Sequence, residues 1–187
     1  MTRQRVLVLE PHNDDCALFC AFPAIDHRAH VITVLRSANQ ERQLGITAEE
    51  REAESAKAAA ELGVTWEQWT YLDTDPDWDE IELRLGVERD DRPPALVYAP
   101  LPEPGGHDQH NEVGEIARRV FADTGALRFY TTYRLGGPRN RTGTDQTYTP
   151  EMVLRKLRAL ACFESQILRG PHRFWLMGLH EYEHAPG

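Results

Sequence analysis

Two short segments of the sequence concentrate side chains that bind metals or move protons. Residues 12–15 read His-Asn-Asp-Asp, and residues 107–110 read His-Asp-Gln-His. Two imidazoles and one carboxylate make a three-ligand set for a catalytic Zn²⁺, which leaves a fourth position for water. Fe²⁺ or another divalent ion accepts the same donors. These residue types predict a divalent-metal site, provided that the fold brings the two segments together.

Such a set of residues predicts a particular kind of chemistry. A catalytic metal lowers the pKa of a bound water to about 7, so that a nucleophile is available at neutral pH. Hydrolysis of an acyl group also needs a base for the proton of the water and a donor for the oxyanion. One carboxylate and one histidine remain for these two roles after the ligand set is filled. The inventory therefore predicts metal-assisted hydrolysis of an acyl group.

A structural interpretation of the first segment competes with the metal site. Asp14 and Asp15 could cap a following helix, and His12 could end a strand. A cap needs only one carboxylate, however, and two adjacent carboxylates repel each other unless a cation lies between them. The His-x-x-His pair in residues 107–110 is a weak metal signal by itself. The two segments together favour the metal site.

The surrounding sequence alternates between strand-like and helix-like segments. Apolar or β-branched runs predict strands at 5–9, 30–35, 67–72, 95–99 and 127–133. Helical spacing predicts helices at 14–25, 47–62, 79–85, 111–122 and from 150 to about 163, the first of them kinked or ended by Pro23. This alternation is typical of an α/β fold with a Rossmann-like, doubly wound, mostly parallel sheet and helices on both faces. We expect a single domain over residues 1–187.

The sequence pattern predicts neither a helix nor a strand in two stretches of the chain. Residues 136–149 show no apolar periodicity and are interpreted as a long functional or mobile loop. The tail after Pro171 is aromatic and rich in histidine, and its pattern does not place it in the fold.

The predicted topology decides whether the two polar segments meet. Ligands of an open α/β sheet bind beyond the carboxyl ends of the strands, at the point where the strand order reverses. With the expected order 3-2-1-4-5, that point lies between the strands at 5–9 and 95–99, which the two polar segments follow. The first of these segments has no Gly-x-Gly-x-x-Gly pattern, and its carboxylates would repel a pyrophosphate. A dinucleotide-binding dehydrogenase is therefore excluded.

Composition and charge limit the classes of partner that we expect the protein to bind. Of 187 residues, 41% are hydrophobic and 27% are charged, and the formal net charge is −9. This negative field repels phosphate backbones and anionic membrane surfaces, so we expect neither nucleic acid nor a membrane as partner. No apolar run approaches the roughly 18 residues of a membrane helix, and the first run is too short for a signal peptide. The lack of a membrane helix and of a signal peptide, together with three cysteines that cannot all pair, predicts a cytoplasmic protein.

At these residues the chain resembles the N-acetylglucosaminyl deacetylase family of the LmbE/PIG-L type. The Pro-His-Pro-Asp-Asp-Glu motif of that family is similar to residues 11–16, and its Gly-x-His-x-x-His element to residues 106–110. Its Arg-x-x-Glu helix, which ends in Leu-Gly-Val, is similar to residues 51–64. The resemblance spans about residues 5–168. Two departures are Asn13 in place of Pro and Cys16 in place of Glu.

The resemblance implies a role for each residue of the two segments. His12, Asp15 and His110 would hold the zinc. Asp14 would be the general base and later the acid for the leaving amine, and His107 would stabilise the oxyanion. Cys16 stands where the family has a carboxylate that is not a ligand, so metal binding should survive this departure. We interpret Cys16 as a buried packing residue, with a soft ligand or a thiol nucleophile as alternatives.

Three further residues are candidates for substrate binding. The resemblance implies that Arg51 could reach the substrate, with a solvated arginine on a helix face as the alternative. Asp73 follows the third predicted strand, where a turn-forming role is the alternative. Arg134 follows the fifth strand and could hold a polar or anionic group, although exposed loop arginines are common.

These observations lead to one expected function with two alternatives. The resemblance implies a zinc-dependent hydrolase that removes an N-acetyl or other N-acyl group from a small-molecule amino sugar or sugar conjugate. One alternative keeps the metal but acts as an amidase or esterase on a non-sugar metabolite. The other is a catalytically impaired relative that binds a metal or ligand without turnover. The sequence leaves a homo-oligomer open.

Overall fold

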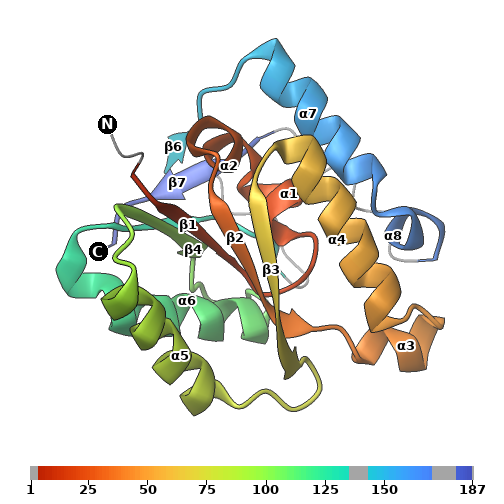
Figure 1. Cartoon of the computed structure of the whole chain (residues 1–187), viewed down its shortest axis with the longest axis horizontal. Coiled ribbons are helices and arrows are strands. Elements are labelled where there is room, and N and C mark those ends of the chain that lie inside the picture. Colours follow the sequence, from red (N-terminus) through yellow and green to blue (C-terminus); the bar gives the residue numbers. More distant parts are fainter. Residues whose placement is uncertain (1–3, 135–142, 170–179, 187) are drawn as a thin grey trace.

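A twisted sheet lies at the centre of the molecule, which Figure 1 shows in the computed structural model. The structure describes residues 4–134, 143–169 and 180–186, and the strand order within them is β3-β2-β1-β4-β5-β7-β6. Neighbouring strands from β3 to β5 are parallel, whereas β7 runs antiparallel to both β5 and β6. The strands are β1 (Val6–Glu10), β2 (His30–Arg36), β3 (Thr65–Leu72), β4 (Leu96–Pro100), β5 (Leu127–Tyr130), β6 (Thr144–Asp145) and β7 (Tyr182–His184). The expected order 3-2-1-4-5 is confirmed.

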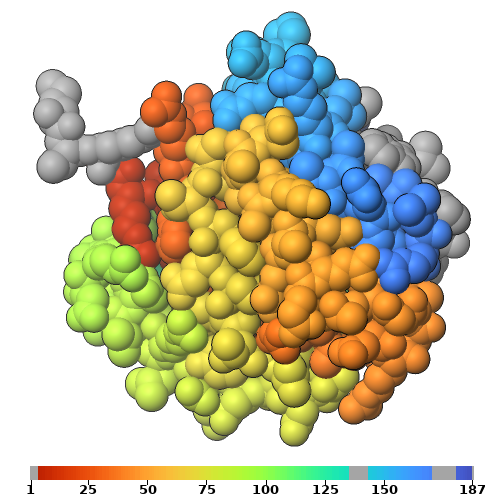
Figure 2. Space-filling model, turned by 45° about the vertical axis from the view of Figure 1, so that its right-hand side comes forward, coloured from red at the N-terminus to blue at the C-terminus, as the bar shows by residue number. Residues whose placement is uncertain are grey.

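Helices cover both faces of the sheet (Figure 1), as the doubly wound interpretation requires. One face carries α1 (Asp15–Phe19), α2 (Ala21–His27), α4 (Ala48–Leu62) and α7 (Pro150–Ala161). The other face carries α5 (Trp78–Asp91) and α6 (Asp108–Phe121). Three short helices, α3 (Asn39–Leu44), a 3₁₀ turn (Ala122–Thr124) and α8 (Glu164–Leu168), complete the described part of the chain. Figure 2 shows α4 and the pair α7–α8 side by side on the surface.

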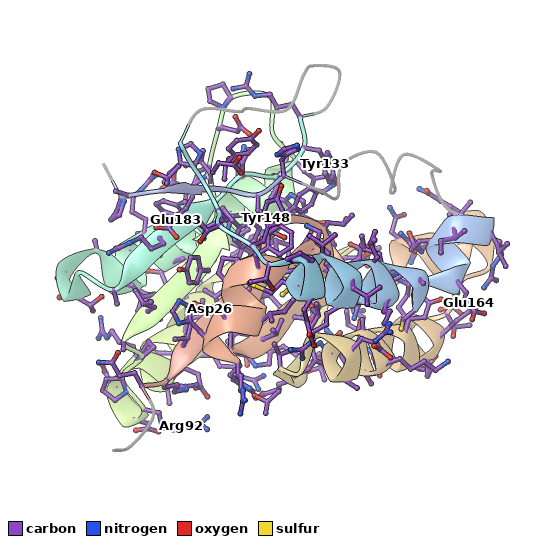
Figure 3. All side chains as sticks on the ribbon, turned by 90° about the horizontal axis from the view of Figure 1, so that it is seen from above. Asp26, Arg92, Tyr133, Tyr148, Glu164 and Glu183 are labelled. Atoms are coloured by element: carbon purple, nitrogen blue, oxygen red, sulfur yellow. The ribbon has the colours of Figure 1, made fainter. Side chains whose placement is uncertain are left out.

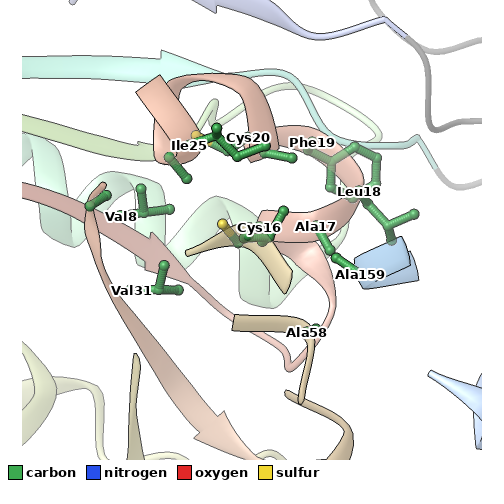
Figure 4. Close-up of a cluster of buried hydrophobic side chains, with 14 of the residues drawn as sticks. Val8, Cys16, Ala17, Leu18, Phe19, Cys20, Ile25, Val31, Ala58 and Ala159 are labelled. Carbon is green, nitrogen blue, oxygen red and sulfur yellow. The ribbon is translucent and has the colours of Figure 1, made fainter. Parts of the chain in front are cut away.

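Strand β1 explains why its sequence is apolar at every position rather than at every second one. Val6 and Val8 pack into the core cluster under α1, α2, α4 and α7, whereas Leu7 and Leu9 pack against α5 and α6. A parallel strand covered on both faces has no solvent side, so the usual alternation disappears. Figure 4 shows Cys16 within the first cluster. Burial raises the pKa of its thiol, which agrees with the packing interpretation.

The helix predicted from residue 47 is confirmed at both ends. The Thr47 hydroxyl accepts a hydrogen bond from the backbone N–H of Glu50, as in a capping box. Gly63 ends the helix in the left-handed region at φ +65°, which glycine adopts without the steric cost of a Cβ.

Other boundaries differ from the prediction. The segment 14–25 forms two helices that separate at Cys20 rather than at Pro23. Pro23 lies in the first turn of α2, where a backbone N–H has no intrahelical partner to lose. Helix α3 was not predicted, the predicted helix at 79–85 extends over Trp78–Asp91, and the fifth strand ends at Tyr130 rather than 133.

The two unassigned stretches contribute an antiparallel extension of the sheet. Part of the predicted loop at 136–149 forms β6, and its residues 136–142, which include Arg139 and Arg141, lie outside the described part. The tail supplies β7, which lies between β5 and β6. Next to β7, the buried Glu181 carboxylate forms an ion pair with the buried Lys156 of α7 at 2.5 Å. The same carboxylate accepts hydrogen bonds from the N–H groups of Ala21 and Phe22.

Among the described residues, no helix is both long enough and apolar enough to cross a membrane.

Candidate metal centre

The two polar segments meet at the carboxyl ends of β1 and β4, which are adjacent and parallel. His12 follows β1, Asp15 opens α1, and His110 lies in the first turn of α6. Gly114, one turn further along α6, faces the Pro100 carbonyl oxygen so closely that a Cβ would collide with it. The glycine therefore lets α6 begin close to the end of β4, which brings His110 to the segment after β1.

The ligand atoms of these three residues form a compact triangle. His12 Nδ1 lies 3.1 Å from His110 Nε2 and 3.4 Å from Asp15 Oδ2. His110 Nε2 lies 3.2 Å from the same Asp15 oxygen. Two tetrahedral ligands with bonds of about 2.0–2.1 Å to a zinc ion are about 3.3–3.4 Å apart. The spacing and the donor types, two imidazoles and one carboxylate, fit a divalent metal.

Charge is unevenly distributed over the triangle. Burial raises the pKa of Asp15, but the charges and hydrogen bonds of His110 and His12 outweigh this and hold that pKa well below its usual range. Burial lowers the pKa of His12, but its hydrogen bond to Asp15 and the Asp15 charge raise the pKa to about 9. The triangle is thus electrostatically suited to a cation next to Asp15.

Asp14 lies beside the triangle, and a buried arginine binds its carboxylate. Its Oδ2 accepts a hydrogen bond from the Arg51 guanidinium at 2.7 Å. Arg51 is only 2% exposed, so the alternative of a solvated arginine on a helix face is wrong. The second terminal nitrogen of Arg51 donates a hydrogen bond to Glu54. The Glu54 carboxylate also accepts hydrogen bonds from the backbone N–H and the hydroxyl of Ser165. The chain of contacts orients one Asp14 oxygen and links it to α8.

His107 is the N-cap residue of α6. Its Nδ1 accepts a hydrogen bond from the Gln109 backbone N–H at 3.3 Å, and its ring lies 5.3 Å from the ring of His12 and 5.0 Å from that of His110. Burial and the two neighbouring histidines lower the pKa of His107 to about 4, so the ring is neutral at pH 7. Tyr133, labelled in Figure 3, packs edge-on against His107 and His110.

The other two substrate-binding candidates have protein partners. The Asp73 carboxylate accepts from the backbone N–H groups of Ala38 and Asn39 at 2.8 and 3.0 Å, so it caps α3. Arg134 pairs with the buried carboxylate of Glu103 at 2.8 Å. Neither contact tests a role in substrate binding, which remains a prediction for Arg51, Asp73 and Arg134.

Sequence reasoning missed two residues, one that contacts a site histidine and one that is buried next to the segment after β1. Gln109 accepts a hydrogen bond from His12, and its place between two site histidines was the available signal. Glu10, at the end of β1, is buried and accepts hydrogen bonds from the Cys16 N–H and the Thr33 hydroxyl. Burial raises the pKa of Glu10 to about 8 against the effect of these hydrogen bonds. No pattern in the sequence separates Glu10 from the many exposed glutamates.

Comparison with known proteins agrees with this geometry. The family model PIG-L: GlcNAc-PI de-N-acetylase matches residues 7–121, which include all residues of the triangle. A search of the curated proteins gave no match.

Several solved structures share the fold. A deacetylase of A40926 pseudoaglycone, Dbv21, superposes with a TM-score of 0.76 at 18% identity, covering 98% of this chain and 97% of its own. A triple mutant of a deacetylase of the teicoplanin biosynthetic pathway gives 0.75 at 18% identity, with 96% of each chain covered. The 4-carboxy-2-hydroxymuconate hydratase GalB from Pseudomonas putida KT2440 gives 0.68 at 15% identity, covering 93% and 82%. At these identities the likeness concerns the fold.

The fold and the family match point the same way. The match extends over more than half of the chain and contains both polar segments. The resemblance inferred from the motifs at residues 11–16 and 106–110 is confirmed, and the chain belongs to the PIG-L (GlcNAc-PI de-N-acetylase) family.

Proposed function

We propose that the protein is a metal-dependent N-deacetylase that removes an N-acetyl or other N-acyl group from a small-molecule amino sugar or sugar conjugate. The observation that carries the proposal is the triangle of His12, Asp15 and His110, with ligand atoms 3.1–3.4 Å apart, beside the carboxylate of Asp14. Family membership adds the reaction, because the family model is that of a de-N-acetylase.

His12, Asp15 and His110 would hold the metal through Nδ1, Oδ2 and Nε2. We propose Zn²⁺, with Fe²⁺ as a second option because it accepts the same donors. When bound, the divalent ion would lower the pKa of a bound water and polarise the amide carbonyl. A solved neighbour described as the zinc inhibited form of teicoplanin deacetylase supports testing more than one metal.

Asp14 is proposed as the general base and acid. Arg51 binds Oδ2, and the Asp14 side chain is 12% exposed, which leaves Oδ1 for a substrate or a water. Asp14 would take a proton from the attacking water and then pass it to the nitrogen of the leaving amine. The buried guanidinium would keep the carboxylate in one orientation through both transfers.

His107 is proposed as the donor to the oxyanion. Because its Nδ1 accepts the Gln109 N–H, the proton of the neutral ring must lie on Nε2. A neutral imidazole whose pKa is about 4 remains a hydrogen-bond donor at pH 7 without carrying charge. It would donate this hydrogen bond to the carbonyl oxygen as negative charge develops there.

The sugar conjugate is the preferred substrate class, because two neighbours are described as deacetylases of teicoplanin biosynthesis and of A40926 pseudoaglycone. A non-sugar metabolite is the second candidate, because the same fold is found in a hydratase of a muconate. A panel of N-acetylated amino sugars, their conjugates and N-acyl amino acids separates the two. The readout is release of free amine by the metal-loaded protein.

The Asp14→Asn variant tests the mechanism on the same panel. We expect it to bind one metal like the wild type and to lose about 10²–10⁴-fold in kcat, as removal of a general base does. Metal titration of both proteins provides the control. A fully active variant would exclude Asp14 as the base, and a metal-loaded wild type without turnover on any substrate would favour the binding-only alternative.

A further inference from the structure

The Gln109 side chain bridges the metal centre and the turn after β3. Its Oε1 lies 2.7 Å from His12 Nε2, and its Nε2 donates a hydrogen bond to the Asp73 carbonyl oxygen at 2.5 Å. The first contact uses Nε2 of His12 and the second uses a backbone carbonyl, so neither occupies a ligand atom of the triangle.

The two contacts together determine the orientation of the amide. The carbonyl oxygen of Asp73 can only accept, so the NH₂ group of Gln109 must face it. Oε1 then faces His12, and it can only accept as well. His12 Nε2 must therefore carry a proton, so that the proton which a metal displaces from the ring is the one on Nδ1, and the lone pair offered to the metal lies there. That is the atom that lies 3.1–3.4 Å from the other two ligand atoms of the triangle.

The second imidazole of the triangle has no comparable partner. His110 is fully buried, and its Nδ1 has no hydrogen-bond partner within the described residues. His12, by contrast, is partly exposed, with 24% of its side chain accessible, so packing alone constrains its ring less. A side-chain hydrogen bond to the outer nitrogen matters most for such a ring.

We propose that Gln109 is the positioning residue of the metal centre: it fixes the Nε2–H tautomer and the ring orientation of His12 and thereby sets the affinity for a divalent metal. The inference rests on the proposed metal site but not on the substrate. It also gives Asp73 a role other than substrate binding, because its carbonyl holds Gln109 while its carboxylate caps α3.

The Gln109→Met variant tests the inference, because it keeps the length of the side chain and removes both hydrogen bonds. We expect the affinity for Zn²⁺ and for Co²⁺, measured by competition with a chromophoric chelator, to fall about 10–100-fold. Gln109→Glu keeps an acceptor for the His12 N–H but loses the donor to the Asp73 carbonyl, so it should recover part of the affinity. Gln43→Met is the matched control, since it makes the same exchange at an exposed glutamine of α3, and its affinity should stay within about twofold of the wild type.

The outcomes distinguish this inference from the proposed function. A Gln109→Met variant that binds both metals like the wild type, or a Gln109→Glu variant as weak as Gln109→Met, overturns the positioning role alone. A wild type that binds neither metal overturns the metal-dependent function itself. Thermal unfolding of the metal-free variants shows whether they are folded. If Gln109→Met does not fold, Gln109→Ala takes its place, because it also removes both hydrogen bonds, and an affinity like that of the wild type then overturns the positioning role.

Discussion

At the scale of single residues, the site combines side chains whose protonation is fixed by neighbours. His107 is neutral at pH 7 because burial and two histidines lower its pKa to about 4, and His12 has a pKa of about 9 beside Asp15. Glu10, which accepts hydrogen bonds from the Cys16 N–H and the Thr33 hydroxyl, is buried, and burial raises its pKa to about 8. Each of these groups therefore makes stability depend on pH in its own range.

Glu10 gives the sharpest prediction. Between its ordinary pKa of 4.5 and about 8, the folded protein keeps the Glu10 proton and the unfolded chain releases it. This contribution to stability is fully present below pH 4.5 and is lost as the pH rises through about 8, by at most about 1.4 kcal/mol per pH unit. We expect Glu10→Gln, which cannot ionise, to lose less stability than the wild type between pH 5 and pH 8.

Urea unfolding of the metal-free proteins at both pH values measures the effect. The exposed Glu41→Gln serves as the control and should follow the wild type. Because His12 and His107 titrate in both proteins, only the difference between wild type and Glu10→Gln reports on Glu10. Parallel curves for these two proteins would contradict a buried, protonated glutamic acid.

At the scale of elements, helix α4 contributes Arg51, which binds the Asp14 carboxylate. Its buried positions include Ala48, Ser55, Ala58 and Leu62, and Arg51 lies in phase with them at helical spacing. The same periodicity therefore places Arg51 on the buried face of the helix. Its burial was missed because the apolar face is identified from apolar residues alone. The guanidinium is buried because two carboxylates, Asp14 and Glu54, receive it.

Arg51→Met should destabilise the protein by about 3–5 kcal/mol, because it leaves two buried carboxylates without their cation. The free energy of unfolding in urea measures this loss. Arg92→Met removes an exposed partner of Glu88 on α5 and should change stability by less than about 1 kcal/mol. Similar losses in the two variants would mean that Arg51 does not pair with Asp14 in the folded protein.

The elements also show why parts of the fold could be predicted and others not. Each parallel strand from β1 to β4 is bounded by turn residues, and the strand order typical of the doubly wound fold then brings His12 to His110. Helix α3 has no buried residue, so it has no apolar periodicity, and its cap comes from the distant Asp73. Strands β6 and β7 are only two and three residues long, too short for an alternation. Their pairing depends on contacts far apart in sequence.

At the scale of the whole molecule, the buried pair of Lys156 and Glu181 connects α7, α2 and the segment before β7. Lys156 Nζ also donates to the Leu18 carbonyl at 2.9 Å, and Glu181 holds the first turn of α2. Burial raises the pKa of Glu181, and the charge of Lys156 acts against this. The pair therefore fastens the antiparallel edge of the sheet to the helix layer.

Lys156→Met should lower the free energy of unfolding by about 3–5 kcal/mol, because it leaves a buried carboxylate without its ammonium partner. The double variant Lys156→Met/Glu181→Gln should recover part of this loss, since it removes the uncompensated charge. Arg169→Met, which breaks an exposed pair with Glu50, is the control and should have little effect. A double variant no more stable than Lys156→Met would assign the loss to packing rather than to charge.

The position of β7 has a consequence for how the protein is made. The parallel strands β1 to β5 pair within residues 6–130, so this part of the sheet can assemble while the rest of the chain is still being synthesised. The edge of β5 gains its neighbour, and Lys156 meets Glu181, only once residues 181–184 have left the ribosome. Until then the nascent chain presents an open strand edge, the kind of surface that chaperones protect from pairing with other chains.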